Sequence, residues 1–184
     1  MESRRLANRL ALTWGVAEGV LFFVVPDVLL TLVAARAGLR RGLDAAWWAL
    51  GGAVIGGLVA FGWGATSPAT ANAAMAALPA VDDTMIATVA DQVATNGAAA
   101  LVTAPLHGRP YKLYAAAAGA GGESPLLLVL WTIPGRMWRF VGLVGLFGAI
   151  AEGRRRWLTA VPSWALVAVW AFFWILVYVK FWLG

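Results

Sequence analysis

The sequence predicts an all-α integral membrane protein, and its composition and its long apolar segments lead to that prediction. Of its 184 residues, 61% are hydrophobic and 12% are charged, whereas soluble domains carry about 25% charged residues. The segments Ala45–Trp63 and Leu158–Val179 contain no charged residue, and each has about the 20 apolar residues that cross a bilayer as a helix. Lipid offers no hydrogen-bond partner to the backbone, so spanning segments of this length must be helical.

The composition and the charge pattern also narrow the classes of function. Without cysteine, the chain has no disulfide, thiolate metal site or thiol nucleophile. The net charge is +5, but the basic residues flank apolar segments, a pattern that orients membrane proteins rather than binding nucleic acid. A signal peptide is the alternative for the basic start and the apolar residues after it. Glu18 in the would-be apolar core and the lack of a small-residue cleavage site argue against it.

The first apolar segment, Leu10–Ala35, is interrupted near its middle by Val24–Asp27. Pro26 removes a helical hydrogen bond, and Asp27 adds a carboxylate within the apolar segment. The interruption therefore predicts two half-helices that meet at a tip, rather than one straight span.

The connection after the first span, Ala65–Ala80, contains proline and alanine, is expected to be polar, and carries neither Lys nor Arg. Asp82–Thr95 follows and predicts a short amphipathic helix at the membrane surface, ended by an Asn-Gly pair. Its apolar residues Met85, Val89 and Val93 share one stripe.

The second half of the chain repeats this layout. Ala98–Gly122 is apolar and is broken by Pro105–Pro110, which predicts a second hairpin of half-helices. Ser124–Ala151 is long enough to span a membrane, although Arg136 and Arg139 lie near its centre.

An offset of 84 residues places Pro26 over Pro110 and Gly51 over Gly135, which indicates a weak internal repeat. Transporter repeats of this kind are often inverted, with the binding site between their broken helices. We therefore expect a single membrane domain, 1–184, with four parts. They are repeat 1 (about 10–65), an external connection with the amphipathic helix (66–97), repeat 2 (about 98–151) and a final transmembrane helix (157–181).

The placement of Lys and Arg predicts the topology under the positive-inside rule. Arginines flank the first hairpin on both sides: Arg4, Arg5, Arg9, Arg36, Arg40 and Arg41. No Lys or Arg lies between Arg41 and Arg109, and Arg154–Arg156 follow the long second span. The N-terminus is therefore expected in the cytoplasm, with about three transmembrane helices and two opposed re-entrant hairpins whose tips meet near the membrane midplane.

Glycines and tryptophans suggest how these elements pack. Glycines recur at three- and four-residue spacing, which lets helices approach closely in lipid, and we expect these faces to hold the hairpins or to make ordinary helix contacts. They are Gly52, Gly56, Gly142, Gly145 and Gly148. Tryptophans near the span ends are expected to anchor the helices at the interfaces. They are Trp47, Trp48, Trp157 and Trp182.

Three segments, Glu18–Asp27, Gly108–Tyr114 and Gly135–Phe140, stand out together. Together they resemble the DedA/VTT membrane family, particularly its small YqaA-like branch, over most of the chain from about Gly15 to Ile150. The resemblance implies opposed re-entrant hairpins, a bacterial inner membrane location, and movement of lipids across or between leaflets. Bacterial members of that family are linked to undecaprenyl phosphate recycling and to proton-motive-force-dependent homeostasis, and eukaryotic relatives scramble phospholipids.

The resemblance covers six charged residues. Glu18 and Asp27 match the acidic pair of the first hairpin. Both are expected to couple transport to protons, and Glu18 is the better candidate because the helix dipole would keep Asp27 ionised. The basic positions are expected to bind the substrate, and they are Arg109, Lys112, Arg136 and Arg139. Two departures are Val25, where a small residue is common, and lysine at position 112, where many relatives have arginine.

The residues themselves support a site between the hairpins. A charge at membrane depth costs about 2.5–3.5 kcal/mol on insertion scales, so such residues face partners or a water-filled cavity. We expect Asp27 to pair with Lys112, and a purely structural ion-pair cluster is the alternative. Pro110 is expected to be the first residue of a half-helix, whose free amides, with Arg109 beside them, suit a phosphate.

The sequence therefore predicts a transporter that flips or scrambles a phosphate-bearing lipid, such as undecaprenyl phosphate or a phospholipid, without a cofactor or metal. The sequence determines neither whether transport is coupled to protons nor whether the protein forms a homo-oligomer. The alternatives are a noncatalytic membrane assembly or homeostasis factor, and an intramembrane lipid-modifying enzyme, for which no nucleophile and base pattern is present. The single histidine, His107, is expected to be a hydrogen-bond partner rather than a proton relay.

Overall fold

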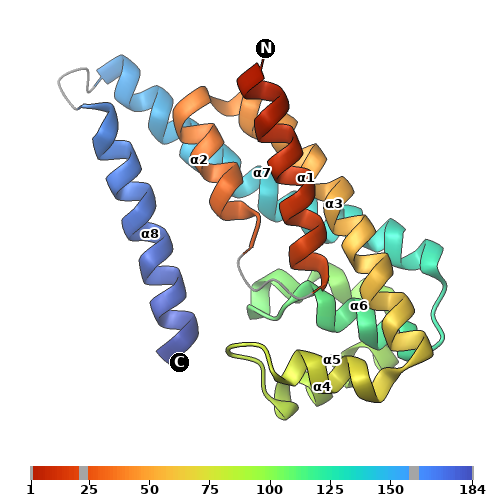
Figure 1. Cartoon of the computed structure of the whole chain (residues 1–184). Coiled ribbons are helices and arrows are strands. Elements are labelled where there is room, and N and C mark those ends of the chain that lie inside the picture. Colours follow the sequence, from red (N-terminus) through yellow and green to blue (C-terminus); the bar gives the residue numbers. More distant parts are fainter. Residues whose placement is uncertain (1, 21–24, 158–161, 184) are drawn as a thin grey trace.

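The structure, a computed structural model, describes residues 2–20, 25–157 and 162–183. These residues form eight α-helices and two short 3-10 helices, without a strand, which confirms the all-α class (Figure 1). Two of the helices, α3 (Leu39–Thr66) and α7 (Pro125–Trp157), are long and apolar enough to cross a membrane. α8 (Ser163–Leu183) contains a shorter apolar segment, Trp164–Lys180.

The first half of the chain has a broken helix followed by a long one. α1 (Glu2–Val20) runs away from the N-terminus, and α2 (Asp27–Ala37) returns to the same end of the molecule (Figure 1). Pro26 immediately precedes α2, so the helix begins where the sequence predicts a break. Val24, part of the predicted break, lies outside the described residues. Gly38, at φ +90°, then separates α2 from α3 in a conformation that favours glycine.

Glycines bring α1 and α3 into direct backbone contact. A Cβ atom on Gly19 of α1 would lie 2.8 Å from the Cα of Gly56 on α3, and Gly52 lies equally tightly against the α1 backbone. These two α3 glycines hold the first hairpin as expected. In contrast, Gly142 and Gly145 on α7 have no described atom within 4 Å of an added Cβ. The expected gripping role of these two residues is wrong, because their side of α7 faces outward.

The connection between the halves is largely helical. α4 (Pro68–Ala76) occupies most of the predicted polar connection, because Pro68 starts the helix and alanines favour it. α5 (Asp83–Asn96) agrees with the predicted amphipathic helix, and the Asp82 carboxylate caps it by accepting from the Met85 amide at 2.6 Å. Val89 and Val93 are buried against the core.

The second half again has a broken arm followed by a long helix, but its first arm is not α-helical. It consists of the 3-10 helices η1 (Gly97–Val102) and η2 (Ala104–His107). Gly97 at φ +58° and the proline in η2 interrupt the α-helical hydrogen-bond pattern and leave tighter turns. α6 (Tyr111–Ala120) is the second arm, and α7 continues through its internal proline without ending.

The second short helix of each half, α2 or α6, packs against the long helix of the other half, and we call this arrangement the exchange of short helices. α1 packs on α3 and η1 packs on α7, so the first arm of each half contacts its own long helix. α6 packs mainly on α3, whereas α2 packs closely on α7, so the second arm also contacts the long helix of the other half. The two apolar core clusters follow this exchange, one around α6 and one around α2 and α7. The breaks in the two hairpins therefore face a shared space between the long helices.

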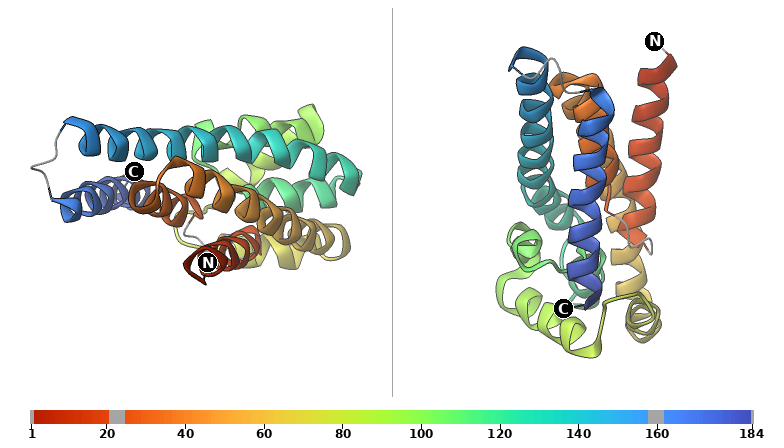
Figure 2. Two further views of the ribbon diagram at one scale, coloured as in Figure 1. Left: turned by 90° about the horizontal axis from the view of Figure 1, so that it is seen from above. Right: turned by 90° about the vertical axis from the view of Figure 1, so that its left-hand side faces the viewer.

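α8 stands at one side of the molecule (Figure 2). It packs mainly on α2, and Phe173 meets Phe147 of α7 edge to face, with ring centroids 5.4 Å apart. Residues 158–161 of the predicted final span lie outside the described residues. Trp47, Trp48 and Trp157 are exposed, in keeping with anchoring, and the side chain of Trp182 is not described.

Candidate functional site

A cavity of about 270 Å³ lies where the two hairpins, α7 and α8 meet. Six charged residues line it, and the sequence singled out all six. They are Glu18, Asp27, Arg109, Lys112, Arg136 and Arg139. The structure thus brings together charges from α1, α2, α7, the start of α6 and the segment before it.

Two buried ion pairs connect the first hairpin to α7. Arg136 donates to the carboxylate of Glu18, and Arg139 donates to Asp27 at 2.5 Å. Glu18 and Asp27 are 2% and 1% exposed, so neither charge is solvated by bulk water and each needs such a partner. The expected pairing of Asp27 with Lys112 is wrong, because α2 packs on α7 and brings Arg139 to the carboxylate.

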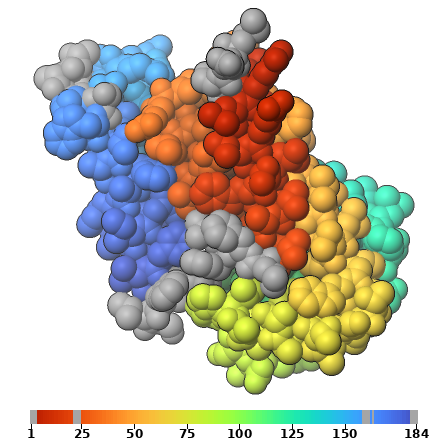
Figure 3. Space-filling model, viewed as in Figure 1, coloured from red at the N-terminus to blue at the C-terminus, as the bar shows by residue number. Residues whose placement is uncertain are grey.

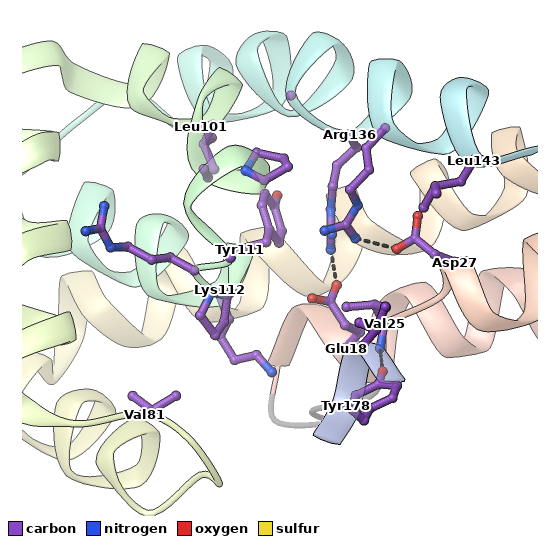
Figure 4. A pocket seen from close by; sticks show the side chains of 18 of the residues that line it. Glu18, Val25, Asp27, Val81, Leu101, Tyr111, Lys112, Arg136, Leu143 and Tyr178 are labelled. Carbon is purple, nitrogen blue, oxygen red and sulfur yellow. Dashed lines mark hydrogen bonds and ion pairs between the residues drawn. The ribbon is translucent and has the colours of Figure 1, made fainter. Parts of the chain in front are cut away.

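Lys112 and Arg109 lie on the opposite wall of the cavity, at the start of α6. Lys112 is 1% exposed, and its side chain extends toward the Glu18 side of the cavity (Figure 4). Arg109 is half-buried, and its buried Nη1 has no hydrogen-bond partner among the described residues. Pro110 immediately precedes α6 instead of being its first residue, because its ψ of 133° is extended rather than helical.

Tyr111 joins this basic wall to the ion pairs, although the sequence did not single it out. The Arg136 guanidinium lies 4.4 Å from the centroid of the Tyr111 ring, a distance at which the ring stabilises a cation. The Tyr111 hydroxyl is hydrogen-bonded to Thr132 Oγ1 at 2.8 Å, and Gly57 leaves room for the ring. Its place between Pro110 and Lys112, at the helix break, was the available signal.

Aromatic side chains of α8 contact the first hairpin. The sequence predicts this segment only as the final span and does not indicate these contacts. The indoles of Trp170 and Trp174 both donate to Thr31 Oγ1 at 3.0 Å. Tyr178 accepts a hydrogen bond from the Val25 amide at 3.0 Å. These three α8 residues recur every fourth position on one helix face, so their spacing was the signal that one side of α8 meets the first hairpin.

Several polar atoms around the cavity keep unused hydrogen-bonding capacity. Within the described residues, Asp27 Oδ1 and the Nε atoms of Arg136 and Arg139 are buried without a hydrogen-bond partner. Buried polar groups are normally paired. The ion pairs therefore neutralise charge without using every donor and acceptor of these side chains.

The net charge of the cavity favours the binding of an anion. The six side chains carry four formal positive and two formal negative charges, so the site is cationic after both carboxylates are paired. Within the described part of the chain, no three His, Asp or Glu side chains lie close enough together to hold a metal ion. His107 is exposed and its Nδ1 lies 3.0 Å from the Thr103 carbonyl, the hydrogen-bonding role expected of it.

Comparisons of the chain with models of protein families, with curated proteins and with solved structures found no match. Function is therefore inferred from this cavity and the side chains around it.

Proposed function

We propose that the chain is an integral membrane protein in which α3, α7 and α8 span the bilayer and the two broken arms are opposed re-entrant hairpins. Both ends of the first hairpin lie at the arginine-rich end of the molecule, and the second hairpin lies at the other end of α3 (Figure 1). The exchange of α2 and α6 between the long helices supports an inverted repeat. The arginine-rich end is cytoplasmic in this proposal, and the membrane is a bacterial inner membrane, as the resemblance to the DedA/VTT family implies.

We further propose that the protein moves a phosphate-bearing lipid across or between leaflets. One observation carries this proposal: a buried cationic cavity lies between the two hairpins and is closed on one side by an apolar helix. Its basic wall can hold a phosphate through charge-assisted hydrogen bonds. Its other wall includes Phe173, Trp174 and Val177 of α8, which can contact an acyl or prenyl chain.

The charged residues have distinct roles in this proposal. Arg109 grips two phosphate oxygens with its planar fork, and Lys112 adds a compact charge. Arg136 and Arg139 complete the cationic field while holding the two acids. Protonation of Glu18 or Asp27 would weaken its ion pair and release an arginine toward the phosphate, and this is the route by which protons would couple to transport.

A noncatalytic assembly or homeostasis factor is the second candidate, because both acids already have arginine partners. In that case the charges only hold the hairpins together. Neutralising a cavity charge would then alter stability, whereas a transporter would lose lipid movement in variants that remain folded.

Reconstitution of the purified protein into vesicles tests the transport proposal. Fluorescent lipids with phosphate-bearing headgroups and an uncharged glycolipid would be compared. Arg109→Lys keeps the charge but loses the fork, and Arg109→Ala loses both. Because a charge-assisted hydrogen bond contributes about 1.5–3 kcal/mol, both variants should weaken apparent affinity for phosphate-bearing lipids about tenfold or more.

His107→Ala is the matched control, because His107 lies nearby, is exposed and does not line the cavity. It should transport at the original rate. Arg109 variants that fold normally and move phosphate-bearing lipids as fast as the original protein would contradict the proposed headgroup site.

A further inference from the structure

A second cavity, of about 230 Å³, lies between α1 and α2 at the arginine-rich end of the molecule. The two arms have few contacts with each other, because α1 packs on α3 and α2 packs on α7. In the space-filling view α1 and α2 lie side by side on the surface near this end (Figure 3). This cavity shares no lining residue with the cavity between the hairpins.

Its walls combine arginines with aliphatic side chains. The polar lining comes from Arg4, Asn8, Arg36 and Arg41, and Leu32 and Val33 of α2 are part of the apolar lining. A site of this composition has two parts, one for an anionic group and one for hydrocarbon.

The arginines are not all neutralised within the protein. Arg4 donates to Asp44 at 2.7 Å, and Asn8 donates to the same carboxylate oxygen at 3.2 Å. Within the described residues, Arg36 and Arg41 have no carboxylate at ion-pair distance. The three arginines therefore bring three positive charges to the cavity and Asp44 offsets one, so the site keeps a cationic excess.

We infer that this cavity binds the phosphate headgroup of an anionic membrane lipid, an inference that rests on the proposed membrane placement but not on the proposed lipid transport. Basic pockets between helices at the cytoplasmic side bind anionic lipid headgroups, and guanidinium forks match phosphate oxygens. Leu32 and Val33 would contact the first part of the lipid chains. The apolar wall favours a lipid over free phosphate, since free phosphate gains nothing from it.

The test uses the full-length protein in a neutral detergent with added phosphatidylglycerol, with phosphatidylcholine and inorganic phosphate as separate arms. Thermal unfolding measures binding, because a ligand that binds the folded state raises Tm. We expect phosphatidylglycerol to raise Tm more than phosphatidylcholine or phosphate at equal ionic strength does, because phospholipid binding between the hairpins would add to the Tm with either lipid, whereas the net negative charge of phosphatidylglycerol favours the arginine-lined cavity. An equal rise with inorganic phosphate would assign a free-anion site and overturn the lipid assignment, and an equal rise with phosphatidylcholine would also overturn it.

Paired variants separate this site from general surface charge. Arg36→Gln/Arg41→Gln removes two arginines that line the cavity, whereas Arg5→Gln/Arg40→Gln removes two exposed arginines that do not line it. Each basic residue near an anionic surface adds to the attraction of an anionic lipid, so the first variant should bind phosphatidylglycerol about tenfold more weakly or worse. The second should bind it much as the original protein does, and equal losses in the two variants would overturn the inference.

Ala7→Trp tests the cavity without changing any charge. Ala7 is half-buried and lines the cavity, so an indole at this position would fill the space while all the arginines stay. This variant should lose the excess rise in Tm with phosphatidylglycerol over phosphatidylcholine, even if Arg36→Gln/Arg41→Gln does not fold. An Ala7→Trp protein that folds and keeps the full excess rise would contradict a site inside the cavity.

Discussion

Asp27 and Arg139 form an ion pair at 2.5 Å although they are 112 positions apart in the chain. The Glu18–Arg136 pair connects the same two regions, and its arginine lies three residues earlier on α7. The end of α1 and the beginning of α2 are thus both attached to one face of α7. The two pairs position the break of the first hairpin against the helix of the second half.

The Glu18–Arg136 pair should stabilise the fold mainly by preventing an unpaired buried charge. Arg136→Gln leaves Glu18 buried without its cation, and we expect a loss of about 3–5 kcal/mol in the free energy of unfolding. Glu18→Gln/Arg136→Gln removes both charges and should recover most of that loss. Denaturant unfolding in detergent measures both variants, and a double variant as unstable as the single one would contradict the ion-pair explanation.

The exposed pair Glu152–Arg156 provides the control. Its two side chains are 48% and 70% exposed, so solvent screens the interaction. Arg156→Gln should leave the free energy of unfolding nearly unchanged.

The Thr31 hydroxyl should determine how firmly α8 is attached to α2. Thr31→Val keeps the shape of the side chain but removes the acceptor shared by Trp170 and Trp174. Trp170 still reaches the Val28 carbonyl at 3.2 Å, so the buried Trp174 donor carries most of the loss, about 1–3 kcal/mol. The distribution of distances between spin labels at Ile175→Cys and Asp83→Cys should broaden in the Thr31→Val protein.

Thr66→Val is the matched control for that substitution. Its hydroxyl is exposed and donates to the Gly62 carbonyl of its own helix at 2.8 Å, so the spin-label distances should stay as they are. Unchanged distances in Thr31→Val would show that the indole hydrogen bonds do not hold α8 in place.

Local signals in the sequence predicted several elements correctly. Pro26 marks the start of α2, the Asp82 cap marks the start of α5, and the uncharged segment Ala45–Trp63 lies within α3. Each of these features depends on residues of a single element or directly before it, so it can be predicted from a local sequence pattern.

Features that depend on packing between distant segments could not be predicted in the same way. The repeat alignment suggested that Asp27 lies near Lys112, but the exchange of short helices brings Arg139 to Asp27. The contact of Tyr111 with Arg136 and the α8 hydrogen bonds to Thr31 also join segments far apart. The sequence identified the charged residues of the cavity because apolar segments make charges conspicuous, and it left their partners open.

The close approach of α1 and α3 should depend on the absence of a side chain at Gly56. A Cβ there would lie 2.9 Å from the Cα of Gly19 and 2.5 Å from the Val16 carbonyl oxygen, and neither backbone atom can rotate away. Gly56→Ala should therefore lower the free energy of unfolding by about 1–3 kcal/mol through overpacking. The measurement is denaturant unfolding in detergent.

Gly62→Ala on the same helix is the control, since no described atom lies within 4 Å of its added Cβ. It should raise the free energy of unfolding by about 0.5–1 kcal/mol, because alanine loses less backbone entropy than glycine in a helix. Equal effects of the two substitutions would show that helix propensity, not the α1–α3 contact, decides both.

The opposed hairpins predict which residues reach the same side of the membrane. The chain has no cysteine, so a single introduced cysteine is the unique thiol for a membrane-impermeant maleimide. Arg9→Cys, in the first half of α1, and Arg40→Cys, in the first turn of α3, are both exposed. The N-terminal ends of α1 and α3 lie at the same end of the molecule (Figure 1). Both should react from the cytoplasmic side, because the re-entrant arms return the chain to the side from which it entered.

Asp83→Cys, at the exposed start of α5 beyond the far end of α3, should react from the opposite side, because α3 crosses the membrane once between the two positions. A conventional arrangement with a complete crossing between positions 9 and 40 would place Arg9→Cys and Arg40→Cys on opposite sides. Labelling of these two positions from opposite sides would therefore remove the first re-entrant hairpin. The proposed meeting of two hairpin tips at one cationic cavity within the membrane would then fail with it.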